Sequence, residues 1–447
     1  MRPNRVSVWT AVVLTSWAMG SPLAAENWSQ WRGAAGTGAS SETGLPVHWS
    51  PAENIAWTAH LSGLGVSSPI VWGDKVFVTS QSGAGRILAG PRLSQGDAAE
   101  QALRGMTAAT GAEHGAVSFA VEAFARSDGH RVWIHDLSAE GDLPSVHDKH
   151  NLASASPVTD GERVYAVFGT GQVVAVDMAG TLVWTRQLGR DFSPFDIQWG
   201  NGSSPLLHRG SLILVCYHQS ASYVIALDSR TGKQLWKTDR PKGLLSYSTP
   251  IVAATPTGDE VIVNSTAGIE AFDGATGAAL WHFDEPNQFP VPVGLVDRGV
   301  IYLSRGYRSG PYAAFRPGGR GDISKSNVLW HVSTGAPYIS SLVYYDGLLY
   351  MVGDVGVVAC IETKTGERLW QQRIGGVFSA SPVAGDGKIY FLSENGETIV
   401  MRAGRSPEVL ARNKIDGRTL ASPAISGGRL FLRTDDALIG IGGRTGS

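Results

Sequence analysis

Cysteine is scarce in this chain, with only Cys216 and Cys360 among 447 residues. Because they lie in different repeats of the sequence, we expect two buried strand thiols and no disulfide between them. The formal net charge is −2, which excludes a general attraction to nucleic acid or to an anionic membrane. After residue 25 no run of about 18 apolar residues occurs, so no membrane-spanning segment is predicted in the mature chain.

The first 25 residues have the pattern of a secretory signal. Arg2 and Arg5 precede a mostly apolar, uncharged run from Val6 to Met19, and small residues suit cleavage near Ala25. The sequence therefore predicts an exported protein, periplasmic or extracellular, with an uncleaved anchor as the alternative. Residues 26–53 are predicted to form an irregular arm that packs two of its aromatic residues, Trp28 and Trp31, on the outside of the domain, with a ligand site as the alternative.

A repeated unit occupies most of the remaining chain. Its clearest copy runs from Ala226 to Trp236 and has the form Ala-x-Asp-x-x-Thr-Gly-x-x-x-Trp, and similar copies cover 271–281 and 360–370. Apolar alternation before the aspartate indicates a strand, Asp-x-x-Thr-Gly indicates a turn, and the tryptophan ends a return strand. The small residue ten positions before the tryptophan is expected to leave room for a neighbouring ring.

The repeats predict an all-β, eight-bladed β-propeller of four-stranded blades over residues 54–443, because they recur about every 40 to 50 residues. The last repeat has three strands, and an isolated strand at 54–61 supplies the fourth, which closes the ring. Residues 81–115 form an insertion in blade 1. Repeat starts, mostly Ser-Pro, are placed at Ser68, Ser156, Ser204, Thr249, Val291, Ser340, Ser381 and Ser422. The docking tryptophans are Trp57, Trp133, Trp184, Trp236, Trp281, Trp330 and Trp370, and Ala411 occupies the remaining position.

This unit resembles the tryptophan-docking motif of the PQQ-like repeat β-propeller family. The blade number and the lack of extra domains are similar to BamB, the propeller of the outer-membrane β-barrel assembly machinery, and the motif is also that of quinoprotein alcohol dehydrogenases. The resemblance implies the fold and leaves the activity open. Quinoprotein dehydrogenases have adjacent cysteines and a calcium-binding Glu, Asn and Asp set, whereas Cys216 and Cys360 are far apart and no such set is recognisable. BamB is a lipoprotein, and this chain has no cysteine near Ala25 to carry a lipid.

One face of the propeller carries the candidate binding residues. The loop into the first strand of a blade and the loop between its second and third strands share this face, because strand direction alternates. A polar, aromatic-lined concavity there is the expected binding site. The candidates are His147, Asp148, Lys149, His150, Asp196, Gln198, Trp199, Asn201, His218, Arg305, Tyr307, Arg308 and Tyr338.

These candidates also have structural alternatives. Residues 147–150 could form a solvated loop, and Trp199 could be a packing residue. Arg305 and Arg308 could form ion pairs with Asp196 or Asp148. No local ligand spacing supports a metal site among the histidines, and no residue stands in a nucleophile context.

We therefore predict an exported, non-catalytic binding or scaffold propeller, similar to BamB and monomeric. It engages an envelope protein, peptide or saccharide at the mouth of the central channel, and this interpretation assigns no catalytic residue, metal or cofactor. The alternative is a quinoprotein-like oxidoreductase of alcohols or sugars, with PQQ and calcium bound at the same mouth.

Overall fold

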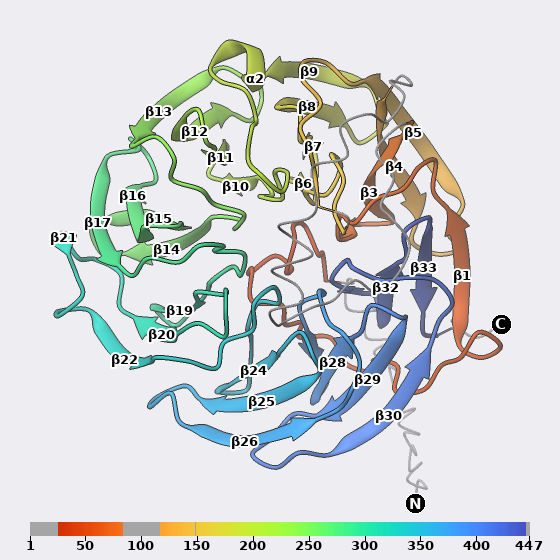
Figure 1. The fold of residues 1–447 in the computed structure, drawn as a ribbon. Helices are drawn as coiled ribbons and strands as arrows, with labels where there is room; N and C mark the ends of the chain where they lie inside the picture. Colours follow the sequence, from red (N-terminus) through yellow and green to blue (C-terminus); the bar gives the residue numbers. More distant parts are fainter. Residues whose placement is uncertain (1–25, 84–116, 148, 444–447) are drawn as a thin grey trace, which may run out of the picture.

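The computed structural model describes residues 26–83, 117–147 and 149–443. They form eight β-sheets arranged in a ring around a central axis (Figure 1). The predicted all-β, eight-bladed propeller is therefore confirmed. The signal segment and most of the insertion lie outside the described residues. We name the strands of each blade A to D from the axis outward, the segment leading into strand A the A-loop, and the turn between strands B and C the BC turn.

The first four blades have the following strands, given in the order A to D. Blade 1 consists of β2 (Ile70–Trp72), β3 (Lys75–Ser82), β4 (Ser118–Ala125) and β5 (Arg131–Ser138). Blade 2 consists of β6 (Val158–Thr159), β7 (Arg163–Val167), β8 (Gln172–Asp177) and β9 (Leu182–Gln187), followed by the short helix α2 (Leu188–Asp191). Blade 3 consists of β10 (Leu206–His208), β11 (Ser211–Tyr217), β12 (Ser222–Asp228) and β13 (Gln234–Arg240). Blade 4 consists of β14 (Ile251–Thr255), β15 (Gly258–Asn264), β16 (Gly268–Asp273) and β17 (Ala279–Asp284).

The other four blades follow the same plan. Blade 5 consists of β18 (Leu295–Asp297), β19 (Val300–Ser304), β20 (Tyr312–Phe315) and β22 (Val328–Val332). Its CD connection contributes β21 (Gly321–Asp322), a short parallel strand on the edge of β17. Blade 6 consists of β23 (Val343–Tyr345), β24 (Leu348–Val352), β25 (Val357–Glu362) and β26 (Arg368–Arg373). Blade 7 consists of β27 (Val383–Gly385), β28 (Lys388–Leu392), β29 (Glu397–Arg402) and β30 (Val409–Lys414). Blade 8 consists of β31 (Ala424–Ser426), β32 (Arg429–Arg433), β33 (Ala437–Ile441) and β1 (Ile55–His60).

The two ends of the chain close the ring in one sheet. Strand β1 pairs antiparallel with β33, with Thr58 opposite Ile439 and His60 opposite Ala437. The N-terminal strand thus completes the last blade, as the isolated strand in the sequence predicted. Closure leaves no open edge between the first and last blades.

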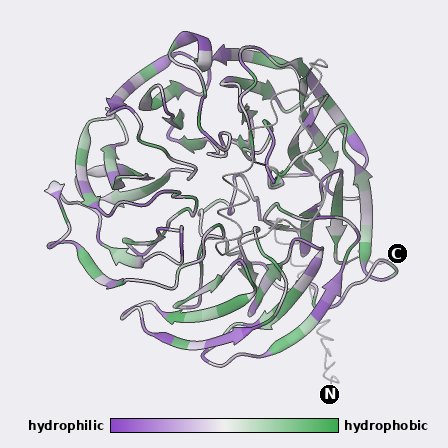
Figure 2. Cartoon of the chain, in the orientation of Figure 1, coloured by the Kyte–Doolittle hydropathy of each residue, from purple (hydrophilic) through white to green (hydrophobic). Residues whose placement is uncertain are grey.

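Burial follows the position of each strand in its blade. The B and C strands are buried on both faces, whereas the outer strands expose alternate residues, as in β13. Figure 2 shows the same gradient, with mixed hydropathy along the rim. Cys216 and Cys360 are buried thiols on inner strands and form no disulfide, and burial raises the pKa of each to about 12. Among the described residues no helix is long and apolar enough to cross a membrane.

The tryptophan on strand D connects most blades to the next. The Trp184 ring lies on Gly232 in the CD turn of blade 3, and its Nε1 donates to the Ser229 carbonyl at 2.9 Å. A Cβ on Gly232 would be 2.8 Å from that ring, so the turn glycine provides the space on this side. The small residue ten positions before each tryptophan lies on strand C of the same blade, directly opposite that tryptophan, as Ala226 does for Trp236.

Five further docking tryptophans donate in the same way to a backbone carbonyl of the following blade: Trp57, Trp133, Trp236, Trp330 and Trp370. Trp281 differs because β21 occupies the space beside β17. Its Nε1 donates to the Glu260 carboxylate at 2.8 Å, within its own blade.

A ring of hydroxyl groups joins the blades near the axis. The backbone amide two residues before strand A donates to the hydroxyl at the same position in the next blade, at 2.8–3.0 Å. Seven such bonds connect Ser68, Ser156, Ser204, Thr249, Val293, Ser341, Ser381 and Ser422. The hydroxyls satisfy amides that would otherwise be buried without an acceptor, which explains the recurrent serine.

Two predicted repeat starts were misplaced. In blade 5 the position in the hydroxyl ring belongs to Val293 and not to Val291, and in blade 6 it belongs to Ser341 and not to Ser340. Val291-Pro292 imitates the Ser-Pro pair in sequence, but strand A begins at Leu295.

Trp49 of the N-terminal arm takes the place of the docking tryptophan that blade 7 lacks. Ala411 pairs with Val400 at the docking position of strand D, and Trp49 and Ala411 belong to the same buried cluster. The Trp49 ring lies 6.5 Å from Tyr390 of strand B, similar to the 6.2 Å between Tyr350 and Trp370 in blade 6. The arm therefore supplies from outside the blade a ring that other blades carry on strand D.

The remainder of the arm runs across the central channel. Trp28 exchanges two backbone hydrogen bonds of 2.8 Å with Val71 of blade 1, and Ser40 donates to Ala384 of blade 7 at 2.8 Å. Arg32 donates to the Leu342 carbonyl of blade 6. The predicted position on the outside of the domain was wrong, because the A strands leave their inner edges unpaired and the arm satisfies them.

Candidate functional site

A cavity of about 320 Å³ opens at the mouth of the central channel. Its walls are A-loops from all around the ring, and its floor is Trp31 of the arm, together with hydroxyls of the central ring such as Ser204 and Ser422. Trp31 of the arm thus narrows the channel at this end of the pit. The volume is near the lower end of the roughly 300–1,000 Å³ typical of ligand pockets, so the pit suits a side chain or a small molecule.

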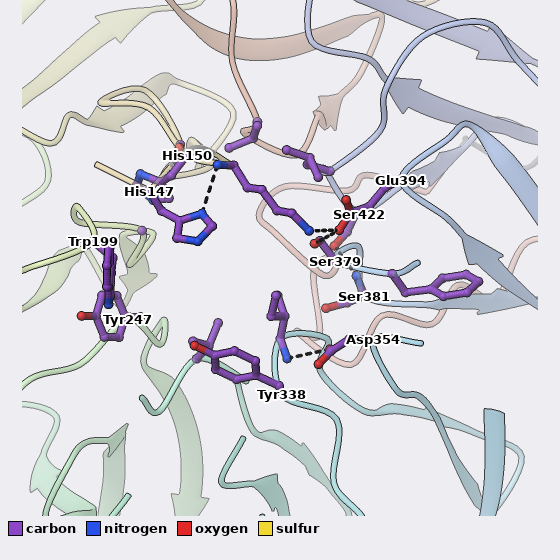
Figure 3. Close-up of a pocket in the computed structure, with 18 of the residues that line it drawn as sticks. His147, His150, Trp199, Tyr247, Tyr338, Asp354, Ser379, Ser381, Glu394 and Ser422 are labelled. Atoms are coloured by element: carbon purple, nitrogen blue, oxygen red, sulfur yellow. Dashed lines mark hydrogen bonds and ion pairs between the residues drawn. The ribbon is translucent and has the colours of Figure 1, made fainter. Parts of the chain in front are cut away.

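Aromatic residues form one wall of the cavity. Trp199, Tyr247, Phe289 and Tyr338 come from the A-loops of blades 3 to 6, and the figure shows several of them around the opening (Figure 3). The Tyr247 and Phe289 ring centroids are 6.4 Å apart. Behind them, Tyr307 contacts Phe289 at 5.0 Å and Tyr338 at 5.1 Å, both edge to face. This mutual packing fixes the rings that face the cavity.

Two histidines of the blade 2 A-loop support this wall. The His147 amide donates to the Trp199 carbonyl at 3.2 Å, and its ring meets the Trp199 indole edge-on at 5.6 Å. His150 packs against Gly200 and Gly202, where a Cβ would come within 3.0 Å of its ring. Burial lowers the pKa of His150 to about 3, so its imidazole is neutral at physiological pH.

Ionic groups line the part of the cavity formed by blades 6 and 7. Lys149 reaches across from the blade 2 A-loop to Glu394 in the BC turn of blade 7, with 2.7 Å between Nζ and Oε1. Ser379 donates to the same carboxylate at 2.5 Å. Asp354, in the BC turn of blade 6, accepts from the Ile339 amide at 3.3 Å. Burial raises the pKa of Asp354 to about 7, and the nearby Glu394 charge adds to the effect.

Stability is expected to depend on pH through Asp354. Between about pH 4 and 7 the folded chain retains a proton that the unfolded chain has released, so the free energy of unfolding falls as pH rises through this window. The slope is at most about 1.4 kcal/mol per pH unit from this group. Urea unfolding at several pH values should therefore show a flatter profile for Asp354→Asn than for the parent. Equal slopes would contradict the prediction, and the exposed Glu367→Gln serves as the control.

The structure brings five of the predicted residues together in the cavity lining, and these are His147, Lys149, His150, Trp199 and Tyr338. The other described candidates lie outside it: Asp196, Gln198, Asn201, His218, Arg305, Tyr307 and Arg308. Asp148 lies outside the described residues.

Several of the residues outside the lining have structural contacts. Arg305 is 1% exposed and donates to backbone carbonyls of blade 4, including Ser265 at 2.8 Å. Among the described residues its acid partner is Glu285, whose carboxylate lies 3.6 Å away, and not Asp196. His218 is buried against Phe195 at 4.3 Å, and burial lowers its pKa to about 4. Asp196 accepts from the Ser220 amide at 3.1 Å and also from its hydroxyl.

Sequence reasoning missed both carboxylates of the cavity, and also Ser379 and the floor residue Trp31. Asp354 and Glu394 stand in Gly353-Asp354-Val355-Gly356 and Ser393-Glu394-Asn395-Gly396, which look like ordinary turns. Their position between strands B and C would have placed them on the binding face. No local pattern signalled Trp31, because its location depends on the path of the arm across the channel.

The lining differs from what the cofactor of a quinoprotein would require. PQQ is a planar tricarboxylate, whereas the charged side chains among the described lining residues are Asp354, Glu394 and Lys149, and Lys149 is already bound to Glu394. Above about pH 7, where Asp354 is ionised, a ligand with several carboxylates would therefore meet more negative than positive charge. Among the described residues, no group of three or more His, Cys, Asp or Glu side chains is arranged to hold a metal ion.

The ring of eight blades and the docking tryptophans define a PQQ-like repeat β-propeller. The chain belongs to the family whose model is described as outer membrane protein assembly factor BamB, which matches residues 118–307 and 321–406. A protein with that name from Burkholderia pseudomallei is 26% identical over 346 residues, covering 63% of this chain and 82% of the relative. Another from Yersinia pestis is 26% identical over 234 residues, covering 47% and 56%.

Solved structures with the same fold include BamB and quinoprotein dehydrogenases. BamB from Moraxella catarrhalis aligns with a TM-score of 0.51 and 16% identity, over 73% of this chain and 90% of that one. The quinohemoprotein alcohol dehydrogenase from Comamonas testosteroni aligns with a TM-score of 0.64 and 13% identity, over 94% and 81%. A europium-containing methanol dehydrogenase aligns with a TM-score of 0.63 and 12% identity, over 91% and 89%. At such identities these similarities show the fold alone.

Proposed function

We propose that this BamB-like propeller is an exported, non-catalytic binding protein that engages an envelope partner at the mouth of its central channel. The observation that carries the proposal is the aromatic-walled cavity, which Trp31 of the arm lines and the A-loops surround. It presents fixed rings and a few polar groups, which is the usual composition of a recognition site. The partner is a protein segment, a peptide or a saccharide.

The relatives support an assembly role. Proteins named outer membrane protein assembly factor BamB are similar over much of the chain, and the N-terminal sequence has the pattern of an export signal. We place the protein in the periplasm, where it would work beside other envelope proteins.

The double variant His147→Ala with Trp199→Ala tests the site. We expect it to weaken partner binding by about tenfold or more, because truncating a central aromatic anchor commonly costs 2 kcal/mol or above. The thermal midpoint should change little, since the two residues lie in the A-loops of blades 2 and 3, at the edge of the cavity. Binding is measured by capture of envelope proteins on the immobilised mature chain. A large loss of stability would show instead that these residues are structural.

The alternative is a quinoprotein-like oxidoreductase, because two dehydrogenases share the fold of this chain. We propose that PQQ is not the ligand, because the charged lining is unfavourable to a tricarboxylate. Calorimetric titration with PQQ and calcium, together with dye-linked oxidation of alcohols and aldoses, tests this directly. Saturable binding with turnover would overturn the binding-protein proposal, whereas the expected result is neither.

A further inference from the structure

A second cavity, of about 200 Å³, lies against the part of the arm that crosses the channel. Residues 30–36 of the arm contribute to one side of it, and the A strands of blades 3, 4 and 5 form the rest. Trp31 lines both this cavity and the mouth cavity. The volume is below the roughly 300–1,000 Å³ usual for ligand pockets, so the cavity suits a very small molecule.

The arm does not pair with the A strands of these three blades. Its backbone is hydrogen-bonded to Val71 in blade 1, Thr159 in blade 2 and Ala384 in blade 7. Among the described residues, none of its backbone hydrogen bonds reaches β10, β14 or β18. The cavity therefore lies where the arm leaves the inner edges of three blades unpaired.

Arg32 brings a buried positive charge to this cavity. It is 2% exposed, and its Nη2 donates to the carbonyls of Thr37, at 3.0 Å, and of Leu342. Its Nε and Nη1 are buried and have no hydrogen-bond acceptor among the described residues. Burial lowers the pKa of Arg32 to about 9, so the guanidinium is still protonated at neutral pH.

The other buried arginines of the described chain have counter-charges, whereas Arg32 has none. Arg305 lies 3.6 Å from the Glu285 carboxylate. Near Arg433, the charges of Glu122 and Asp435 raise its pKa against the effect of burial. No such charge acts on Arg32. A buried cation without a counter-charge is strongly unfavourable, and a bound anion would remove this penalty.

The rest of the lining decides which kind of anion fits. The side formed by the blades is mostly aliphatic and includes Leu206, Ile251, Val293 and Leu295. His208, the other titratable side chain among the described lining residues, is bound to Asp259 at 2.9 Å. One guanidinium balances a monoanion, whereas a dianion would keep an uncompensated charge beside apolar walls. The lining therefore favours a carboxylate on a short hydrocarbon chain.

We propose that this cavity binds a small aliphatic monocarboxylate, whose carboxylate accepts from Arg32 and whose hydrocarbon chain contacts the aliphatic side chains of blades 3 to 5. The proposal goes beyond the proposed function, because this second site does not require the mouth cavity to bind a partner. Ala34 and Ala35 line the cavity and are exposed, so the site is accessible from solvent.

The test titrates butyrate, n-butanol and inorganic phosphate by calorimetry into the mature chain from Glu26, in a buffer free of carboxylates and phosphate. We expect butyrate to bind about tenfold or more tightly than n-butanol, which lacks the charge, and more tightly than phosphate. Arg32→Met should weaken butyrate binding about tenfold or more. Arg230→Gln, which removes an exposed cation from the CD turn of blade 3, is the matched control and should leave it unchanged.

Thermal unfolding distinguishes a ligand site from a purely structural arginine. In the parent, the midpoint should rise with butyrate concentration, because butyrate binds the folded state. Arg32→Met should lose this rise. Arg32→Gln, which retains a donor for the Leu342 carbonyl and removes the charge, should lose it as well. An equal rise in the parent and in both variants would overturn the proposal.

The remaining outcomes locate the site and its chemistry. Lys149→Met removes the cation of the mouth cavity and should not affect butyrate binding, so a loss in this variant but not in Arg32→Met would overturn the proposal. Equal binding of butyrate and n-butanol would overturn the role of Arg32, and tighter binding of phosphate would overturn the assignment to a monocarboxylate. Absence of butyrate binding at millimolar concentration would overturn this site, whereas the capture of envelope proteins tests the proposed function separately.

Discussion

Trp49→Ala is expected to destabilise the protein by about 3 to 5 kcal/mol, the usual cost of truncating a buried tryptophan. Trp49 is 3% exposed and fills the docking position of blade 7, where strand D has only Ala411. Its loss would leave a cavity beside Tyr390, whereas the backbone amide at this position, which donates to Asn413 at 3.0 Å, is retained. Urea unfolding followed by tryptophan fluorescence measures the effect.

A second-site rescue makes this prediction specific. Ala411→Trp places the ring on strand D, as in the other blades, so the double variant with Trp49→Ala should be more stable than Trp49→Ala alone. In the parent background Ala411→Trp should destabilise, because two rings would compete for one space. Leu235→Ala, on the half-exposed rim of blade 3, is the control and should change stability by no more than about 0.5 kcal/mol. Failure of the rescue would show that Trp49 does not substitute for a docking tryptophan.

Gly366→Ala is expected to cost about 3 kcal/mol, through two separable effects. Gly366 has φ of +74°, a conformation that costs a residue with a side chain roughly 1 to 2 kcal/mol. In addition, the new Cβ would lie 2.6 Å from the Trp330 ring of blade 5. That ring has little freedom to move, because its Nε1 donates to the Thr363 carbonyl at 2.7 Å in the same turn.

Gly347→Ala separates the backbone effect from the clash. Gly347 is in the same blade with φ of +79°, and a Cβ there would meet no atom within 4 Å. We expect its substitution to cost only the conformational part, about 1 to 2 kcal/mol, and the difference between the two variants to report the contact with Trp330. Equal losses of stability would refute the role of the turn glycine in receiving the neighbouring ring.

The glycine of the Thr-Gly turn illustrates how repeats specify a propeller. Turn geometry alone explains the glycine at position 232, and the Asp-x-x-Thr-Gly pattern in the sequence indicates this turn. The contact with Trp184 of the preceding blade appears only when the blades are arranged side by side. Trp281 shows the reverse case, since its sequence context predicts docking on the next blade, but β21 occupies the adjacent position.

The sequence by itself determined the fold class, the number of blades and the closure of the ring, because each blade repeats a local pattern of strand, turn and anchor. It also placed His147, Lys149 and Trp199 on the binding face, since strand alternation assigns every loop to one face or the other. Tertiary structure alone decided the path of the arm, the substitution of Trp49 in blade 7 and the floor formed by Trp31. It also decided the pairing of Lys149 with Glu394, because these groups are separated by 245 positions in sequence and meet only across the closed ring.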